Sequence, residues 1–267
     1  MVAPMTEHPE GEADFGFRRV AENEKAQLVR GVFDSVASRY DLMNDLMSAG
    51  IHRLWKAELI DRLSPRPGET FLDLAGGTGD VGLAILSRMR ERREKAERAG
   101  SPVSGRVVIC DINEKMLRVG RDRAVDRGVL SGIEWVCGDA EKLPIASSSV
   151  DAYTVAFGLR NVTHLDEALA EARRVLKPGG RFFCLEFSQL AVKPLVPFYD
   201  FYSFTVMPLM GQLFANDRES YRYLAESIRR FPPQEEFLRR IEAAGFGQAR
   251  YRNMSGGVAA LHTAWRV

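Results

Sequence analysis

Between residues 70 and 187 the chain alternates short apolar runs with stretches of helical period, and this alternation constrains the fold more than any other feature. The apolar runs show little polar alternation, which is typical of strands covered by helices on both faces. Two further runs near the C-terminus are predicted to extend the same sheet. The predicted strands are residues 70–74, 106–111, 133–137, 150–156, 181–187, 247–252 and 258–267. The pattern predicts an α/β, doubly wound, Rossmann-like sheet of seven mostly parallel strands.

Helical spacing of apolar residues surrounds these strands. The predicted helices are residues 24–40, 51–63, 81–98, a stretch from Glu114, 165–176 and 233–244. Residues 1–22 are predicted to be a flexible tail, and residues 23–267 to form one domain. Within that domain, residues 23–68 are expected to be a helical cover. Residues 190–232, rich in tyrosine, phenylalanine and proline, are expected to be an inserted aromatic lid; a dimer interface or plain core packing is the alternative.

Composition excludes several classes of protein. The 37 Lys and Arg residues nearly balance the 36 Asp and Glu residues, so the net charge of +1 argues against a nucleic-acid partner. No stretch has the ~18–20 apolar residues that a membrane span needs. Cys110, Cys137 and Cys184 lack metal-ligand spacing, and each falls in a predicted strand, where a small buried side chain is expected. No metal is predicted, and the expected location is cytoplasmic, with peripheral contact to the inner face of a membrane left open.

The loop after the first predicted strand points to a nucleotide-like ligand. Asp73 ends the strand, and Gly76, Gly77, Thr78 and Gly79 turn the chain into a helix. Glycines allow a sharp turn and close approach to a ligand, and the free N–H groups of a helix start favour an anion. The turn alone is weak evidence, because strand–helix turns use glycine for structural reasons as well.

The acids after the next two strands narrow the ligand. Asp111 stands where a carboxylate accepts both hydroxyls of a ribose, and Asp139 with Ala140 stands where an adenine edge is read. A dinucleotide fingerprint places its acid about 20 residues after the glycines, whereas Asp111 lies 111 − 79 = 32 residues beyond Gly79. The insertion before Ser104 means that this spacing does not by itself exclude NAD. Together with residues 177–180, the elements follow the layout of a class I methyltransferase that binds S-adenosylmethionine.

Longer motifs carry a more specific resemblance over residues 15–267. They are residues 32–41 (VFDSVASRYD), 44–48 (NDLMS), 50–56 (GIHRLWK), 72–80, 157–163 (FGLRNVT), 216–232 with the core SYRYLAESIR, and 257–262 (GVAALH). In these motifs the chain resembles the ubiquinone/menaquinone biosynthesis C-methyltransferase family (the UbiE/MenG type). The resemblance implies C-methylation of a polyprenylated hydroquinone ring, either 2-polyprenyl-6-methoxy-1,4-benzoquinol or demethylmenaquinol or both. It also implies that Thr78, Asp111, Asp139 and Ala140 contact S-adenosylmethionine, and that Ala156, where the family often has serine, offers only its backbone.

The predicted reaction centre follows the fourth strand. Arg160 and Asn161 face the crevice where ligands bind in such sheets, and the resemblance places this pair at the chemistry. Arg160 is predicted to stabilise a phenolate or polarise a water, with a surface ion pair as the alternative. Asn161 is predicted to orient a ring oxygen or that water.

Four further side chains are candidates for substrate contacts. Tyr199, Tyr202 and Tyr221 are expected to line a quinol pocket, although core packing explains them as well. His262 has the pKa of a proton acceptor, yet a structural role in the terminal strand is the favoured interpretation.

Other classes of function remain open from the sequence. An NAD-dependent oxidoreductase, a non-enzymatic scaffold for quinone-synthesis partners and an O-methyltransferase of small phenols are the alternatives. The predicted partners are a lipid-tailed quinol and other quinone-biosynthesis enzymes, and a homodimer is left open.

Overall fold

A computed structural model describes residues 11–36, 45, 48, 50–97, 105–191, 194, 197, 201–206, 209, 212 and 217–267. Its centre is a seven-stranded sheet in the order β5–β4–β3–β6–β7–β9–β8. The strands are β3 (Thr70–Leu74), β4 (Arg106–Asp111), β5 (Ile133–Cys137), β6 (Val150–Ala156), β7 (Leu176–Phe187), β8 (Phe246–Met254) and β9 (Ala259–Arg266). The strands β3 to β7 pair in parallel, and β9 runs antiparallel between β7 and β8. The predicted sheet of seven mostly parallel strands is confirmed.

One strand begins earlier than the sequence predicted. The strand β7 starts at Leu176, which pairs with Val150 ahead of a register shift, and not at Arg181. Lys177 and the glycines that follow are therefore part of an extended, bulged strand start.

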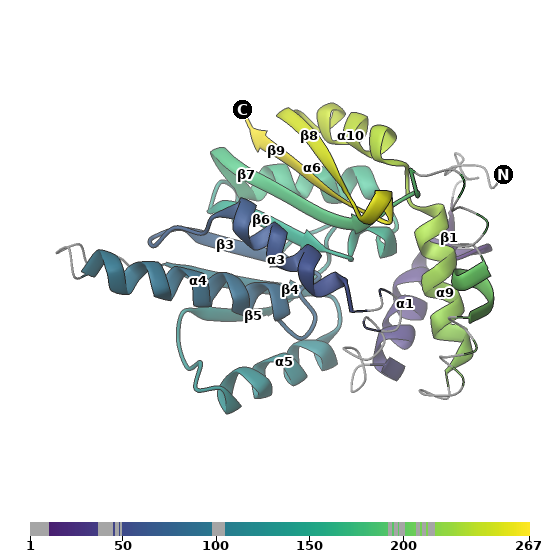
Figure 1. The fold of residues 1–267 in the computed structure, drawn as a ribbon, viewed down its shortest axis with the longest axis horizontal. Helices are drawn as coiled ribbons and strands as arrows, with labels where there is room; N and C mark the ends of the chain where they lie inside the picture. The colour runs from purple at the N-terminus through teal and green to yellow at the C-terminus, as the bar shows by residue number, and fades with distance from the viewer. Residues whose placement is uncertain are drawn as a thin grey trace.

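Helices cover both faces of the sheet, as the apolar strands require (Figure 1). On one face, α3 (His52–Leu63) and α4 (Asp80–Glu97) bury Leu59, Leu63 and Ile85 against alternate residues of the strands. On the other face, α6 (Leu165–Val175) and α10 (Gln234–Ala243) bury Leu169 and Phe237. The helix α5 (Glu114–Asp126) packs against β4 and β5.

The strand order reverses at β3, since β4 lies on one side of it and β6 on the other. In open parallel sheets, ligands bind outside the carboxyl ends of the strands at such a switch point. Two helices, α1 (Glu22–Val36) and α9 (Arg218–Arg230), stand beside each other beyond this end of the sheet (Figure 1). They cap the region where a ligand is expected.

The N-terminal segment differs from its prediction. Instead of a flexible tail over residues 1–22, the chain forms a hairpin of β1 (Glu12–Phe15) and β2 (Arg18–Ala21), and α1 starts at Glu22. Each strand has only four residues, too few to give a clear sequence pattern. Contacts with α9 stabilise the hairpin. Its turn residue Gly16, with φ 61°, lies against Glu226 of α9, and Glu226 Oε2 accepts a hydrogen bond from the Phe17 N–H at 2.9 Å. Residues 1–10 lie outside the described residues.

The structure tests the predicted burial of the cysteines and part of the predicted lid. Cys110 and Cys184 are buried as expected, but Cys137 is exposed, because β5 is the edge strand of the sheet. Of the predicted lid over 190–232, the structure describes α9, the helical turn η4 (Tyr202–Val206) and a few single residues. The rest of that segment lies outside the described residues, as do residues 98–104 of the charged excursion.

Candidate active site

The glycine turn after β3 has the backbone that its sequence predicts. Gly77 has φ 52° and Gly79 has φ 86°, both in the left-handed region that favours glycine. A Cβ at Gly76 would lie 2.6 Å from the Ile109 side chain, and one at Gly79 would lie 2.6 Å from Trp135. The turn is therefore pressed against β4 and β5, and only glycine fits.

Asp111, at the end of β4, holds this turn in place. Its Oδ2 accepts the Gly77 N–H at 2.9 Å and its Oδ1 accepts the Asn113 N–H at 2.8 Å. Burial raises the pKa of Asp111, and these backbone hydrogen bonds oppose that effect. The bonds orient both oxygens of the carboxylate, which also lines the cavity at the switch point of the sheet, here called the main cavity.

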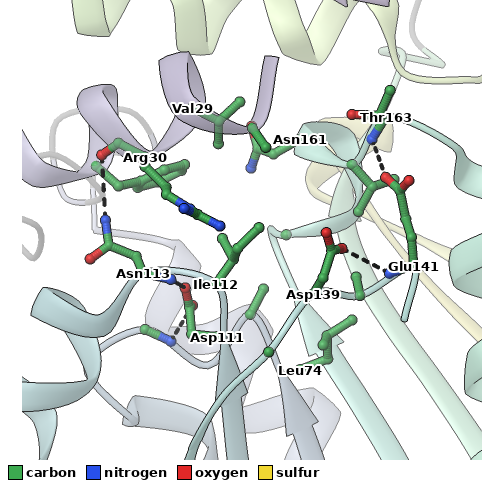
Figure 2. A pocket seen from close by; sticks show the side chains of 18 of the residues that line it. Val29, Arg30, Leu74, Asp111, Ile112, Asn113, Asp139, Glu141, Asn161 and Thr163 are labelled. Carbon is green, nitrogen blue, oxygen red and sulfur yellow. Dashed lines mark hydrogen bonds between the residues drawn. The ribbon is translucent and has the colours of Figure 1, made fainter. Parts of the chain in front are cut away.

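This cavity has a volume of about 360 Å³, which falls within the range of small-molecule sites. Its floor comes from residues that follow β3, β4, β5 and β6, and its roof comes from α1. Its lining includes Glu22, Val29, Arg30, Phe33, Ala75, Gly77, Asp111, Ile112, Asp139, Ala140, Glu141, Phe157, Asn161 and His164. Figure 2 shows side chains of Arg30, Ile112, Asp139 and Asn161 directed into the same space.

A second, much smaller cavity of about 20 Å³ adjoins the glycine turn. Its lining contains four predicted cofactor residues: Asp73, Gly76, Thr78 and Ala156. The Asp73 Oδ1 accepts a hydrogen bond from Thr154 Oγ1 at 2.8 Å, and burial raises the pKa of Asp73 to about 7. Ala75 lines both cavities, so they lie on either side of the same turn residue.

The predicted reaction-centre pair divides between two environments. Asn161, in the turn η2 (Leu159–Asn161), lines the main cavity. Arg160 points the other way: its side chain is 2% exposed and its Nη1 donates to Glu186 Oε1 at 2.8 Å. Direct contact between Arg160 and a ring in the cavity is thus not what the structure shows. The buried carboxylate of Glu186, on β7, takes the guanidinium instead.

The three predicted substrate residues that the structure describes do not line the main cavity. Tyr221 lies on α9 and is fully buried in the hydrophobic core, and Tyr202 is half-buried against the same core. His262 is buried on β9 with its Nε2 3.1 Å from the Gln234 carbonyl oxygen, and burial lowers its pKa to about 4. The structural alternative for His262 is therefore the better one. Tyr199 lies outside the described residues.

Sequence reasoning missed the roof of the cavity. The helix α1 was predicted as a cover, but none of its side chains was named as a lining residue. Its two ends are fastened to opposite sides of the site. At one end, Lys25 Nζ donates to the Val162 carbonyl oxygen at 2.7 Å. At the other, Asp34 accepts hydrogen bonds from Asn113 Nδ2 at 2.9 Å and from Lys115 Nζ at 2.5 Å.

A histidine joins the first of these ends to the cavity rim. His164 Nδ1 lies 2.8 Å from Glu141 Oε2, and its Nε2 lies 3.2 Å from Glu22 Oε1 on α1. The hydrogen bond with Glu141, followed by that with Glu22, raises the pKa of His164. Ligand atoms of Glu141, His164 and Glu167 lie within 4.8 Å of one another, but hydrogen bonds already engage the first two. The absence of a metal stays a prediction.

A doubly wound sheet with a glycine turn at its switch point, an acid after β4 and another after β5 defines a class I, S-adenosylmethionine-dependent methyltransferase. The residues fit that cofactor, since Gly77 of the turn and the acids Asp111 and Asp139 border one cavity. The chain belongs to the ubiE/COQ5 methyltransferase family, whose model matches residues 19–266.

Relatives support this assignment along the whole chain. A ubiquinone/menaquinone biosynthesis C-methyltransferase of Paracoccus denitrificans is 53% identical, with 98% of this chain and all of the relative covered. One of Acidiphilium cryptum is 55% identical over 95% of this chain and 96% of the relative. The mitochondrial 2-methoxy-6-polyprenyl-1,4-benzoquinol methylase of Xenopus laevis is 47% identical over 99% of this chain and 93% of its own.

Solved structures support the fold. A SAM-dependent methyltransferase from Aquifex aeolicus has a TM-score of 0.56 at 16% identity, covering 79% of this chain and 89% of that one. The [4+2]-cyclase SpnF has a TM-score of 0.61 at 18% identity, covering 90% and 96%. One of these folds thus serves a cyclase, so the fold alone does not name the reaction. Among the described residues, no helix combines the length and apolar character needed to cross a membrane.

Proposed function

We propose that this enzyme transfers a methyl group to a ring carbon of a polyprenylated hydroquinone, as a step of ubiquinone or menaquinone synthesis. The acceptor is 2-polyprenyl-6-methoxy-1,4-benzoquinol, demethylmenaquinol or both. The names of full-length relatives at 47–55% identity support this acceptor class.

One observation carries the proposal: the main cavity has a polar side and a largely apolar side. Asp111 and Asp139 border the first side, where the nucleoside of the methyl donor would bind. Phe157 and Asn161 border the second, under Val29 and Phe33 of α1. A flat ring with an oxygen substituent fits beside these apolar side chains, with the Asn161 amide within reach of its oxygen.

The residues act chiefly by positioning. Bound S-adenosylmethionine supplies a methyl group that is electrophilic because of the neighbouring sulfonium. The acids after β4 and β5 fix the donor, while Asn161 orients a ring oxygen and α1 shields the cavity from water. Correct alignment of two reactants is worth ~7–11 kcal/mol of barrier. A hydroquinone carbon is already nucleophilic, so a strong base is not required.

We also propose peripheral contact with a membrane and a cytoplasmic location. Moving a polyprenyl tail from an apolar phase into water costs about 0.8 kcal/mol of free energy per CH₂. Binding the substrate at the bilayer surface avoids this cost. Phe17, Phe201 and Phe204 are exposed near the cap, and aromatic rings of this kind suit a membrane interface. Association with other quinone-synthesis enzymes and formation of a homodimer stay proposals.

Quinone profiling by mass spectrometry tests the proposed acceptor. A strain that lacks this protein is expected to accumulate a quinone one methyl group lighter than the mature one, and the accumulating species names the substrate. Complementation with the intact chain is expected to restore the methylated quinone. Complementation with the Asp111→Ala variant is expected to leave the methylated quinone absent. An unchanged quinone profile would contradict the proposal.

Purified enzyme then separates the alternative functions. Labelled S-adenosylmethionine and a short-tailed benzoquinol are expected to give a product whose label resists O-demethylation. Label on oxygen favours a phenol O-methyltransferase instead. Saturable NAD binding without binding of S-adenosylmethionine favours the oxidoreductase.

A further inference from the structure

Tyr223 of α9 contacts the back of the candidate active site, and neither the family assignment nor the sequence reasoning gives it a role. Its hydroxyl donates to Asn161 Oδ1 at 3.0 Å, across 62 residues of sequence. Its ring stacks on Phe15 of the hairpin, with centroids 4.2 Å apart and planes 19° from parallel. The residue is only 4% exposed and belongs to the hydrophobic core, so its position is held by packing.

The protonation of the Tyr223 hydroxyl sets the direction of this hydrogen bond. The charge of Arg160 acts on the phenol oxygen and favours its negative form, but burial dominates and raises the pKa of Tyr223 far above its ordinary value. The hydroxyl therefore keeps its proton. It donates this proton to Asn161, whose Oδ1 is an acceptor and cannot donate.

The direction of that bond fixes the orientation of the amide. With Oδ1 of Asn161 occupied by Tyr223, the Nδ2 group is the part left to face the main cavity. Figure 2 shows this nitrogen directed into the space between α1 and Ile112. The backbone of Asn161 is fixed as well, since its N–H donates to the Gly158 carbonyl oxygen at 3.1 Å.

We propose that Tyr223 is a positioning residue: it holds the Asn161 amide so that its NH₂ group donates a hydrogen bond to an oxygen of the acceptor ring. This inference rests on the proposed function. A donor at that oxygen stabilises the phenolate form, in which the ring carbon is more nucleophilic.

Tyr223→Phe is the decisive variant, because it removes the hydroxyl and keeps the ring that stacks on Phe15. With a short-tailed benzoquinol and saturating S-adenosylmethionine, kcat/KM is expected to fall roughly three- to tenfold, the value of one neutral hydrogen bond. The rising limb of the kcat–pH profile is expected to move up by about half a unit to one unit, as the donor no longer favours the phenolate. The Kd for S-adenosylmethionine by calorimetry stays within twofold. Tyr251→Phe removes an exposed hydroxyl bound to Glu235 and serves as the matched control, without effect.

A double-mutant cycle separates positioning from packing. In an Asn161→Ala background, Tyr223→Phe is expected to have no further effect on kcat/KM, because Tyr223 acts through that amide. An effect of the same size in both backgrounds overturns the proposal, and so does a Tyr223→Phe enzyme with wild-type kcat and pH profile. If Tyr223→Phe fails to fold, Asn161→Asp tests the proposal instead. This variant keeps an acceptor for the Tyr223 hydroxyl but turns an oxygen, which cannot donate, toward the ring. Its kcat is expected to be lower than that of Asn161→Ala. Equal or higher kcat overturns the proposal. A wild-type enzyme that binds S-adenosylmethionine yet methylates no quinol refutes the proposed function itself.

Discussion

Replacing Asp111 by asparagine tests the assignment of the cofactor side of the cavity. The carboxylate accepts N–H groups of Gly77 at 2.9 Å and of Asn113 at 2.8 Å, and its outer face lines the cavity. The amide keeps the shape but has one acceptor oxygen, so a ribose hydroxyl loses a charged partner. A hydrogen bond to a charged group contributes about 1.5–3 kcal/mol, which corresponds to roughly 10- to 150-fold weaker binding.

Isothermal titration calorimetry with S-adenosylmethionine and with S-adenosylhomocysteine measures this loss. Both ligands are expected to bind more weakly, because they share the ribose and differ only in the methyl group and the positive charge that it gives the sulfur. Asp122→Asn, an exposed carboxylate of α5, is the control for the loss of a charge and is expected to bind normally. Binding by Asp111→Asn within twofold of wild type would refute the assignment of Asp111 as the ribose acceptor.

Three further predictions concern the structure around the cavity. Glu186→Gln leaves the buried charge of Arg160 without a counter-ion and is expected to lower the free energy of unfolding by about 3–5 kcal/mol, measured by urea denaturation; unchanged stability would contradict the buried pair. His164 has a raised pKa in the folded protein, so its attachment to Glu22 of α1 is present below pH ~6.5 and is lost as pH rises through the raised pKa. Stopped-flow release of S-adenosylhomocysteine is accordingly expected to speed up over that window, and a His164→Gln enzyme with the same pH dependence would exclude the attachment. Gly120→Ala is expected to lower the melting temperature, because its Cβ would lie 2.7 Å from a backbone oxygen, whereas Gly31→Ala, with nothing within 4 Å, is expected to leave it unchanged or raise it.

The sheet could be predicted from the sequence because its signals are local. The runs at Thr70–Leu74 and Arg106–Asp111 are apolar on both faces and end at a glycine turn or an acid, and the structure has both strands at the predicted bounds. The cofactor side of the cavity follows from the same signals. Parallel strands bring their carboxyl ends to one edge, so residues that follow β3, β4 and β5 must meet there.

The acceptor side could not be predicted in this way, because its contacts depend on distant partners. Arg160 turns away from the cavity because Glu186, 26 residues later, offers a buried carboxylate. The hairpin of residues 12–21 folds because α9 receives it, and the four-residue strands have no signal of their own. Tyr223 stood inside a motif that carried the family resemblance, yet a motif does not show which of its side chains contacts Asn161.

The two sides of the cavity are therefore expected to change independently. The donor side is built from strand ends within one continuous stretch of sheet, so most substitutions there disturb the fold as well as the cofactor. The acceptor side is formed by Phe157 and Asn161 after β6 and by α1, and the hairpin and α9 pack against α1 beyond the sheet. A [4+2]-cyclase with the same fold illustrates that the sheet tolerates a different reaction above it. Specificity for one quinol ring over another is consequently expected to follow residues of α1 and α9, and the dependence on S-adenosylmethionine to follow Asp111 and the glycine turn.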